Sequence, residues 1–517
     1  MLLQEAADVL AKHWLPSILA LAAVYLAASY TIEYRRLRGF PGPLLGSFSY
    51  LWLAYNGVRG RQGAIYYETM KKYRVPEHSF VRIGPNDLMT DSPEVVRRMS
   101  SARSTYLRSS WYRTTKLDPY GDSLLSTLDT AHHDALKAKA GRGYAGRDNE
   151  NLESDIDGQV RALIGLLERK YLSSDHGGGL GDGSSFRPVD MATTMQYFTL
   201  DAITKLAYSN AFGFLERDMD VHGYMKAIRD VVPLIIVSSE WPLAGSVFFS
   251  SWFLKLFGPT PTDKTGVGKI MGTLREVVAT RFGPEAKDRP DMLGSFVRNG
   301  LSQYQCEQEV MLQIVAGSDT TATALRGTLL RLCSTPKVYL KLQKEIDEAV
   351  RSGMVGEGVI HHETAKKLPY LQAVIYEGLR LNPPFTGVLM KEVPPGGDEM
   401  DGVFIPAGVR IGVSAKSIQM RQDVYGHDVD LFRPERWTEC DEQTRMRMAA
   451  NTELVFGYGR WMCAGKNVAF MELNKVYFEL LRRFDFQVVD TKNPVKEENF
   501  NVVFHKDMFM KVTRRVL

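Results

Sequence analysis

A glycine-framed cysteine near the end of the chain constrains the fold more than any other stretch. Residues 456–466 read FGYGRWMCAGK and lead directly into a helical pattern over 467–484. A helix N-terminus offers free N–H groups and partial positive charge, which favour a thiolate. The glycines permit positive φ and let a flat ligand approach the backbone. On these residues alone, Cys463 is equally consistent with an activated thiolate and with a buried structural cysteine.

Composition excludes several classes of protein. The chain has 517 residues, of which 44% are hydrophobic, so it can bury a large core. The net charge of +4 gives no argument for a nucleic-acid partner. The four cysteines form no C-x-x-C pair, so neither a zinc site nor a disulfide framework is predicted.

The first part of the chain predicts a membrane anchor. No residue from Trp14 to Ile32 is charged, and this length suffices to span a bilayer as a helix. Arg35, Arg36 and Arg38 follow it, which places the bulk of the chain on the cytosolic side. A cleaved signal peptide is the alternative, but the apolar run is long and its charge order is inverted. We expect a lumenal N-terminus (1–13), a transmembrane anchor (14–32), a basic, proline-rich hinge (33–43) and one catalytic domain (44–517).

Hydrophobic periodicity predicts an α+β fold that is mainly α. Apolar residues recur at helical spacing over 156–171, 191–208, 303–333 and 337–351, and strand-like runs occupy 80–89, 403–414 and the last thirty or so residues. One large helical body with small peripheral sheets is therefore expected, with a loop insertion at 173–186. The apolar stretch 231–258 fits either core or a lid over an apolar cavity that also touches the membrane surface, and we favour the lid.

The segment 316–321 (AGSDTT) lies at the middle of the predicted helix 303–333. Glycine, an acid and two threonines make a poor helix centre, and a threonine hydroxyl can bond the carbonyl four residues earlier. Asp319 and Thr320 at a widened turn would relay protons to a ligand bound against the helix. An N-cap pair at a helix break is the alternative.

Two further segments carry charged residues that can pair. Glu377 and Arg380, three residues apart, share one face of a helix that ends at Asn382-Pro383-Pro384. Arg436, in the segment 432–437 (FRPERW), can join them in a buried network. Taken alone, the Glu377–Arg380 pair is equally typical of a helix surface.

These four segments, in this order, resemble the cytochrome P450 family of haem-thiolate monooxygenases, and the resemblance covers nearly the whole chain. The sequences of the cysteine loop and of residues 106–112 are most similar to those of fungal microsomal members of the family, near the pisatin-demethylase-like and benzoate-hydroxylase-like groups. The resemblance implies a cytochrome P450-like fold with an N-terminal transmembrane helix. It also implies a single-pass protein of the endoplasmic reticulum membrane whose catalytic domain is cytosolic.

The resemblance implies haem b as cofactor, with Cys463 as the axial ligand of its iron. Phe456 would shield the sulfur, and Gly459, Arg460, Trp461 and Gly465 would complete the haem loop. His133 and Lys137, four apart on a predicted helix after Asp129, match the family's propionate-binding helix.

The loop departs from the family at one position. The family places Arg or His two residues before the cysteine, where it binds a haem propionate, but this chain has Trp461 there and Arg460 beside it. An indole N–H donates a hydrogen bond but carries no charge. Other cations must then supply the charge, and Lys391 is a third candidate beside His133 and Lys137.

The implied reaction inserts one oxygen atom of O2 into an apolar small molecule, in fungal secondary metabolite biosynthesis. Asp319 and Thr320 would deliver protons, and Glu377, Arg380 and Arg436 would be structural. Electrons would come from NADPH through a membrane-bound NADPH–cytochrome P450 reductase with an acidic face. Arg460, Lys466 and Lys475 suit such docking, although they are equally consistent with solvated charges.

Two other functions use the same cofactor. A haem-thiolate isomerase or dehydratase would need neither O2 nor a reductase, and a haem-binding sensor would have no catalytic activity. The intact pair Asp319-Thr320 and the anchor disfavour the first. The sensor is disfavoured because it has no need for a proton relay.

The sequence predicts the effects of two substitutions in the cysteine loop. Cys463→Ala is expected to abolish the thiolate-type Soret band of the carbon-monoxide complex and all oxygenation, because alanine offers the iron no ligand. Turnover retained in this variant would refute the assignment. From the sequence alone, Trp461→Arg is expected to leave haem binding intact, as judged from the haem spectrum.

Overall fold

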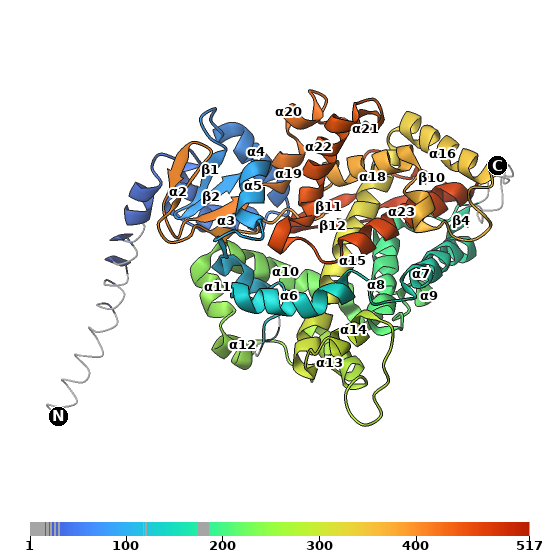
Figure 1. The fold of residues 1–517 in the computed structure, drawn as a ribbon, viewed down its shortest axis with the longest axis horizontal. Coiled ribbons are helices and arrows are strands. Elements are labelled where there is room, and N and C mark those ends of the chain that lie inside the picture. The colour runs from blue at the N-terminus through green and yellow to red at the C-terminus, as the bar shows by residue number, and fades with distance from the viewer. Residues whose placement is uncertain are drawn as a thin grey trace.

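The computed structural model describes residues 16, 20, 23–24, 27–28, 31–116, 118, 121–173 and 186–515. Helices form most of this part of the chain and small sheets lie at its edges (Figure 1), as the α+β prediction requires. Most of the predicted anchor 14–32 lies outside the described residues, as does nearly all of the predicted loop 173–186. Among the residues that are described, no helix is both long and apolar enough to cross a membrane.

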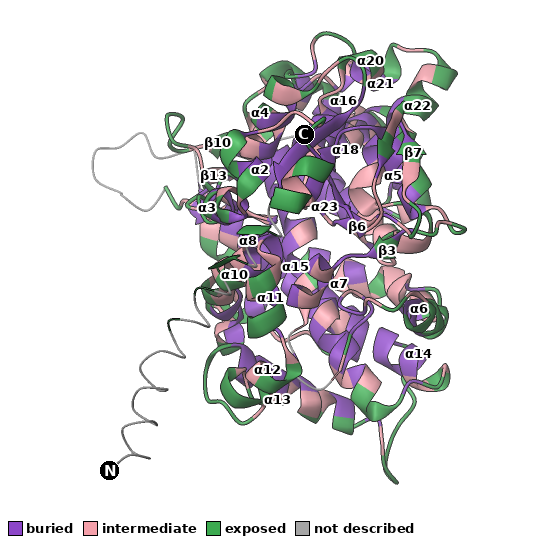
Figure 2. Cartoon of the chain, turned by 90° about the vertical axis from the view of Figure 1, so that its left-hand side faces the viewer, coloured by how far each residue is buried: buried purple, intermediate pink, exposed green. Residues whose placement is uncertain are grey.

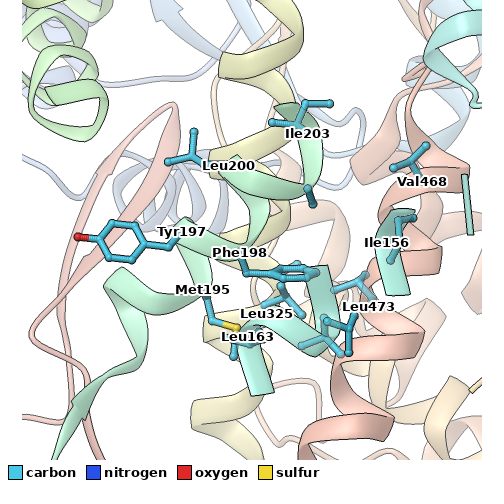
Figure 3. Packing of buried hydrophobic residues seen from close by; sticks show 14 of the residues in the cluster. Ile156, Leu163, Met195, Tyr197, Phe198, Leu200, Ile203, Leu325, Val468 and Leu473 are labelled. Carbon is cyan, nitrogen blue, oxygen red and sulfur yellow. The ribbon is translucent and has the colours of Figure 1, made fainter. Parts of the chain in front are cut away.

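The long helix α15 (Gln303–Cys333) and its neighbour α8 (Met191–Tyr208) form the centre of the molecule, and both have the predicted bounds. Ser302 and Gln305 form a capping box at the start of α15, which satisfies two of the free N–H groups there. Phe198 of α8 and Leu325 of α15 belong to the largest hydrophobic cluster (Figure 3). Burying each such side chain contributes roughly 1.5–3 kcal/mol.

Two more helices complete this core. Leu163 comes from α7 (Leu152–Leu166) and Leu473 from α23 (Lys466–Arg483), the helix that follows the cysteine loop. The other helices are α2 (Leu44–Phe48), α3 (Leu51–Gly57), α4 (Gln62–Tyr73), α5 (Pro93–Ser100), α6 (Thr130–Tyr144), α9 (Phe214–Arg217), α10 (Tyr224–Glu240), α11 (Pro242–Phe248), α12 (Ser251–Phe257), α13 (Gly266–Ala279), α14 (Met292–Arg298), α16 (Pro336–Arg351), α17 (His362–Ala365), α18 (Pro369–Leu381), α19 (Ala415–Gln419), α20 (Gln422–Tyr425), α21 (Glu435–Thr438) and α22 (Glu442–Thr452). Short 3-10 turns lie at η1 (Ser110–Thr115), η3 (Val221–Gly223), η4 (Glu453–Phe456) and η5 (Gly459–Trp461), and α7 ends in the π-helical turn η2 (Leu167–Tyr171).

The five-stranded sheet brings together segments that are far apart in the sequence. Its order is β1 (Phe80–Gly84), β2 (Asp87–Thr90), β9 (Arg410–Val413), β6 (Lys391–Glu392) and β3 (Leu107–Arg108). The strands β2 and β9 are parallel, and the other neighbours are antiparallel. The register of β3 and β6 sets Arg108 directly opposite Lys391.

The remaining strands form smaller sheets. The strand β13 (Phe509–Arg514) lies between β10 (Phe484–Val488) and β4 (Leu172–Ser173), and β5 (Val189–Asp190) also pairs with it. Two hairpins pair β7 (Asp398–Met400) with β8 (Val403–Ile405) and β11 (Lys496–Phe500) with β12 (Val502–Lys506).

The start of the predicted hinge is fastened to the first sheet. The buried guanidinium of Arg82, on β1, donates hydrogen bonds to the carbonyls of Glu33, Tyr34, Gly84 and Pro85. A guanidinium has donors in a fixed fork and can satisfy several carbonyls at once. The residues that follow the predicted anchor are therefore held against the body.

The apolar stretch 231–258 folds as the end of α10, α11 and α12. The end of α10 is buried at Ile236 and Glu240. In contrast, α11 and α12 carry exposed large apolar side chains, including Leu243, Trp252 and Phe257, and show exposed surface in Figure 2. A reading of the whole stretch as core is therefore wrong.

Candidate functional site

The cysteine loop, residues 456–466, joins η4 to α23. Gly457 and Gly459 have φ of 74° and 54°, the left-handed region that favours glycine. A Cβ on Gly459 would lie 2.4 Å from the carbonyl oxygen of Ser100, so no larger residue fits. The N–H of Cys463 donates to the carbonyl of Phe456 at 2.7 Å, which closes the loop.

Cys463 lies two residues before Gly465, the N-cap of α23, and the backbone N–H groups of Gly465 and Lys466 are directed at its sulfur. The side chain is accessible, yet it lies deep enough for burial to raise the pKa of the thiol; the two N–H groups and the ammonium of Lys137 act in the opposite direction. The ring of Phe456 packs on Phe470 beside it, with centroids 5.4 Å apart. This arrangement can hold a thiolate once a cation or metal is present.

The helix α6 places His133 and Lys137 against the cysteine loop. The ammonium of Lys137 donates to the carbonyls of Arg460 at 2.5 Å and Met462 at 3.1 Å. The ring of His133 lies 4.3 Å from that of Trp461, centroid to centroid. Burial lowers the pKa of His133 to about 4, so this imidazole is neutral at neutral pH.

Two more cations converge on Trp461. The Cζ of Arg108 lies 4.4 Å and the Nζ of Lys391 lies 3.9 Å from the centre of its indole ring. The same two groups lie 4.7 and 4.8 Å from the ring of Tyr112. We call Arg108, Tyr112, His133, Lys391 and Trp461 the Trp461 cluster.

The two cations of the Trp461 cluster have no acidic partner among the described residues. The adjoining carboxylate of Asp134 contacts His133 at 2.9 Å and Arg460 at 3.2 Å instead. The guanidinium of Arg108 donates to three backbone carbonyls, those of Leu124, Leu125 and Thr127. In the part of the chain that the structure describes, neither Arg108 nor Lys391 forms an ion pair. Within the described residues, the Nε of Arg108, the Nζ of Lys391 and the Nε1 of Trp461 are buried without a hydrogen-bond partner.

Such an arrangement is unfavourable without an anion. Burial lowers the pKa of Arg108 to about 10, and burial and neighbouring positive charges lower that of Lys391. Like charges directly opposite each other on two strands repel, and a buried unpaired charge is costly. The two carboxylates of haem b would satisfy both cations and the indole N–H. A thiol at a helix N-terminus and, at Trp461 of the same loop, two cations without an acidic partner in the described chain therefore fit the cofactor that the sequence implies.

Sequence reasoning named Lys391 but missed Arg108 as part of this site. Arg108 lies in the stretch 106–112 that carried the family resemblance, and a lone Arg in a strand-like run is no signal by itself. Only the pairing of β3 with β6 sets it opposite Lys391.

The centre of α15 is not interrupted as predicted. Residues 303–333 form one α-helix, without the widened turn or break expected at 316–321. The hydroxyl of Thr320 does donate to the carbonyl of Ala316, at 2.8 Å, and both residues lie on an accessible face of the helix. The backbone hydrogen bonds of α15 tolerate this hydroxyl because tertiary packing fixes the helix.

Asp319 and Thr320 bond to different partners. Its carboxylate accepts a hydrogen bond from the side-chain amide of Gln196 on α8 and is buried. Burial raises the pKa of Asp319 to about 6, although the charges of Arg326 and Arg229 act against this. The acid is thus held between α15 and α8 rather than beside the Thr320 hydroxyl.

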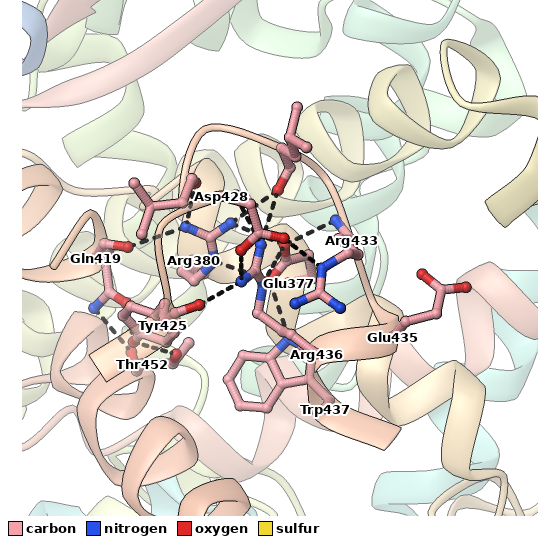
Figure 4. A network of polar contacts seen from close by, with 12 residues as sticks. Glu377, Arg380, Gln419, Tyr425, Asp428, Arg433, Glu435, Arg436, Trp437 and Thr452 are labelled. Atoms are coloured by element: carbon pink, nitrogen blue, oxygen red, sulfur yellow. Dashed lines mark hydrogen bonds and ion pairs between the residues drawn. The ribbon is translucent and has the colours of Figure 1, made fainter. Parts of the chain in front are cut away.

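The structure brings Glu377, Arg380 and Arg436 together in one buried network (Figure 4). Arg380 donates twice to the Glu377 carboxylate at 2.8 Å, and Arg436 donates once at 3.0 Å. The indole N–H of Trp437 and the backbone N–H of Arg433 also donate to it. Burial alone would raise the pKa of Glu377, but the two arginines hold it below its ordinary value.

One of the three basic residues expected to dock a reductase is wrongly assigned. The side chain of Lys475 is fully buried and pairs with Asp157 at 2.7 Å and Glu153 at 2.8 Å. Residues 472, 475 and 479 share the inward face of α23, a spacing that the sequence already contains. The side chain of Arg460 bonds the carbonyls of residues 102 and 104, and that of Lys466 pairs with residue 453, so both are only partly accessible.

Comparisons with known proteins agree on the family. The model of the cytochrome P450 family matches residues 76–511. A cytochrome P450 monooxygenase ABA1 of Pyricularia oryzae (strain 70-15) is 85% identical over 517 residues, which is the whole of both chains. Cytochrome P450 monooxygenase aba1 of Botryotinia fuckeliana (strain B05.10) is 42% identical over 92% of each chain. The solved cytochrome P450DA heme domain matches the fold with a TM-score of 0.70, at 17% identity, over 92% of this chain and 96% of its own.

The chain belongs to the cytochrome P450 family. It is a cytochrome P450 monooxygenase, which uses haem b, O2 and a small-molecule substrate and receives its electrons from an NADPH-dependent reductase.

The Glu377 network generates a prediction for stability. Glu377→Gln leaves two buried arginines facing a neutral amide, and we expect it to lower the free energy of unfolding by about 3–5 kcal/mol. Thermal unfolding and the haem content of the purified protein measure the effect.

A matched substitution just after α21, the helix that carries Arg436, controls for the loss of a carboxylate. Glu439 is exposed and pairs with Arg433 at 3.4 Å, so Glu439→Gln is expected to cost at most about 1 kcal/mol. Equal losses in the two variants would show that the buried network has no special structural role.

Proposed function

We propose that this chain is a membrane-anchored monooxygenase that inserts one oxygen atom of O2 into an apolar small molecule of fungal secondary metabolism. The observation that carries the proposal is the accessible thiol of Cys463 at the N-terminus of α23, in the same loop as Trp461, whose ring faces the cations Arg108 and Lys391. On this proposal Cys463 is the axial ligand, and the Trp461 cluster binds the propionates. When bound, haem b supplies the activation of dioxygen.

In this proposal, Asp319 and Thr320 donate and accept the protons that the reaction needs. An acid with a pKa of about 6 exchanges its proton near neutral pH, which suits a general acid or base. The amide of Gln196 fixes the carboxylate of Asp319 between α15 and α8. The hydroxyl of Thr320 donates a hydrogen bond to the Ala316 carbonyl and lies on the accessible face of α15. On this proposal it turns toward a bound molecule.

The apolar surroundings support an apolar substrate. Leu125, Leu128, Phe385 and Leu389 are partly buried and pack against the hydrophobic cluster that includes Tyr112. Leu389 has φ of 45°, rare for a leucine, and the hydroxyl of Tyr112 donates to its carbonyl at 3.2 Å. Backbone strain of this kind concentrates at ligand sites, where the surrounding structure enforces it.

Membrane attachment is part of the proposal. The uncharged run 14–32 is the proposed anchor, and Arg35, Arg36 and Arg38 favour a cytosolic body at the endoplasmic reticulum. Large apolar side chains are also exposed on α2 and α3 and on α11 and α12, and both α3 and α11 pack against α10. Exposed apolar side chains of this size suit contact with a lipid surface. They include Leu44, Leu45, Phe48, Leu51, Leu243, Trp252, Leu256 and Phe257.

Reconstitution tests the reaction. The full chain in lipid, with NADPH–cytochrome P450 reductase and NADPH, is incubated under labelled O2 with panels of terpenoids, polyketides, alkaloids and aromatic compounds. We expect one labelled oxygen atom per product and product formation that requires both the reductase and O2. Turnover without either would favour an isomerase or dehydratase instead.

Asp319→Asn separates the proposed proton role from a structural one. Removal of an acid that moves a proton is expected to lower product formation on the order of 10²-fold. Because burial raises the pKa of Asp319 to about 6, the native protein loses stability relative to this variant as the pH rises from about 4 to about 6. The loss reaches at most about 3 kcal/mol and persists above that range.

Product yield and denaturant unfolding at about pH 5 and about pH 7.5 give both readouts. An unchanged product yield, with the expected change in stability, would show that Asp319 is structural only.

A further inference from the structure

Trp461 has the most unusual surroundings in the cysteine loop. Its ring contacts three basic side chains, Arg108, Lys391 and His133, that come from β3, β6 and α6. It is a neutral residue, and the buried N–H of its own indole has no partner within the described chain.

The two charged contacts are geometrically alike. The Cζ of Arg108 and the Nζ of Lys391 lie within 4.4 Å of the indole centre, and both also lie within 4.8 Å of the Tyr112 ring. A cation over an aromatic face is attracted by the negative face of the ring, most strongly over tryptophan. The attraction offsets part of the repulsion between two cations that the sheet register sets opposite each other.

The fourth basic residue nearby is occupied elsewhere. Lys137 donates to two carbonyls of the cysteine loop, those of Arg460 and Met462. Its charge adds to the positive potential without binding the ring. Within the described residues, the cluster therefore already holds two cations without an acidic partner, and the charges of Arg460 and Lys137 also act on Lys391.

We propose that Trp461 is a positioning residue, whose indole ring holds the buried cations Arg108 and Lys391 in place for the carboxylates of the cofactor. The proposal rests on the proposed function, since it takes the bound anion to be haem b. An arginine at position 461 would bring a further cation into a cluster whose adjoining carboxylate, Asp134, is already engaged by His133 and Arg460, and it would remove the ring that both cations face. The expectation from sequence alone, that Trp461→Arg leaves haem binding intact, is thereby reversed.

Three variants of the full-length holoenzyme test this. Trp461→Phe keeps an aromatic face, Trp461→Leu removes it, and Trp461→Arg replaces it with a charge. The readout is the rate at which each protein releases haem to an excess of apomyoglobin. We expect Trp461→Phe to stay within about threefold of the native rate, and the other two to release haem roughly tenfold faster or more, because two cation–π contacts are lost.

A double substitution tests whether the ring acts through the cations. Lys391→Met removes one of the two cations that the ring faces and, because Lys391 is itself a proposed contact of the haem carboxylates, it is expected to speed haem release on its own. If Trp461 acts by positioning Lys391, adding Trp461→Leu to Lys391→Met costs less than Trp461→Leu costs alone, so the two effects are less than additive. Fully additive effects overturn the proposal, as does a Trp461→Arg protein that holds haem as tightly as the native one.

Tyr458→Leu is the matched control in the same loop. Tyr458 is exposed, and no cation contacts its ring in the described residues, so its haem release is expected to be unchanged. The carbon-monoxide spectrum of the native protein tells the two proposals apart. A normal thiolate-type Soret band with no effect of position 461 refutes only the role of Trp461, whereas a native protein without that band refutes the proposed function.

Discussion

Two groups of buried cations are balanced in opposite ways. Arg380 and Arg436 pair with Glu377 and Asp428 inside the protein. Arg108 and Lys391 have no acidic partner within the described residues. Loss of an acid from the first group is costly because it leaves buried charge unpaired, whereas the second group favours the binding of an anion. The ring that both cations of the second group face, Trp461, belongs to the loop that holds the Cys463 thiol at the N-terminus of α23.

The two networks also differ in how the chain builds them. Glu377 and Arg380 lie on one helix and meet through its own geometry, before Arg436 joins them. Arg108 and Lys391 meet only when β3 pairs with β6. The Trp461 cluster is therefore complete only after distant segments have assembled, whereas the Glu377 pair forms locally.

This difference explains how much the sequence predicts. The bounds of α8 and α15 follow from local periodicity and capping, and both agree with the structure. The position of Arg108 opposite Lys391 is set by strand pairing between distant segments, which no local pattern contains. The direction of Asp319 is likewise decided by packing of α15 on α8, which also keeps the helix unbroken through a segment of poor helix formers. The burial of Lys475 depends on the two acids that α7 brings to it, and no local pattern around this lysine indicates them.

The register of β3 and β6 has a consequence for how the holoenzyme is made. Without an anion, closing this sheet edge forces two like charges together, so the edge resists closure. A dianion that binds only the closed edge stabilises the folded state in proportion to its concentration and affinity. Haem supply then acts as a thermodynamic control on the amount of folded enzyme, and a cell short of haem would hold less of the protein as well as less of its activity.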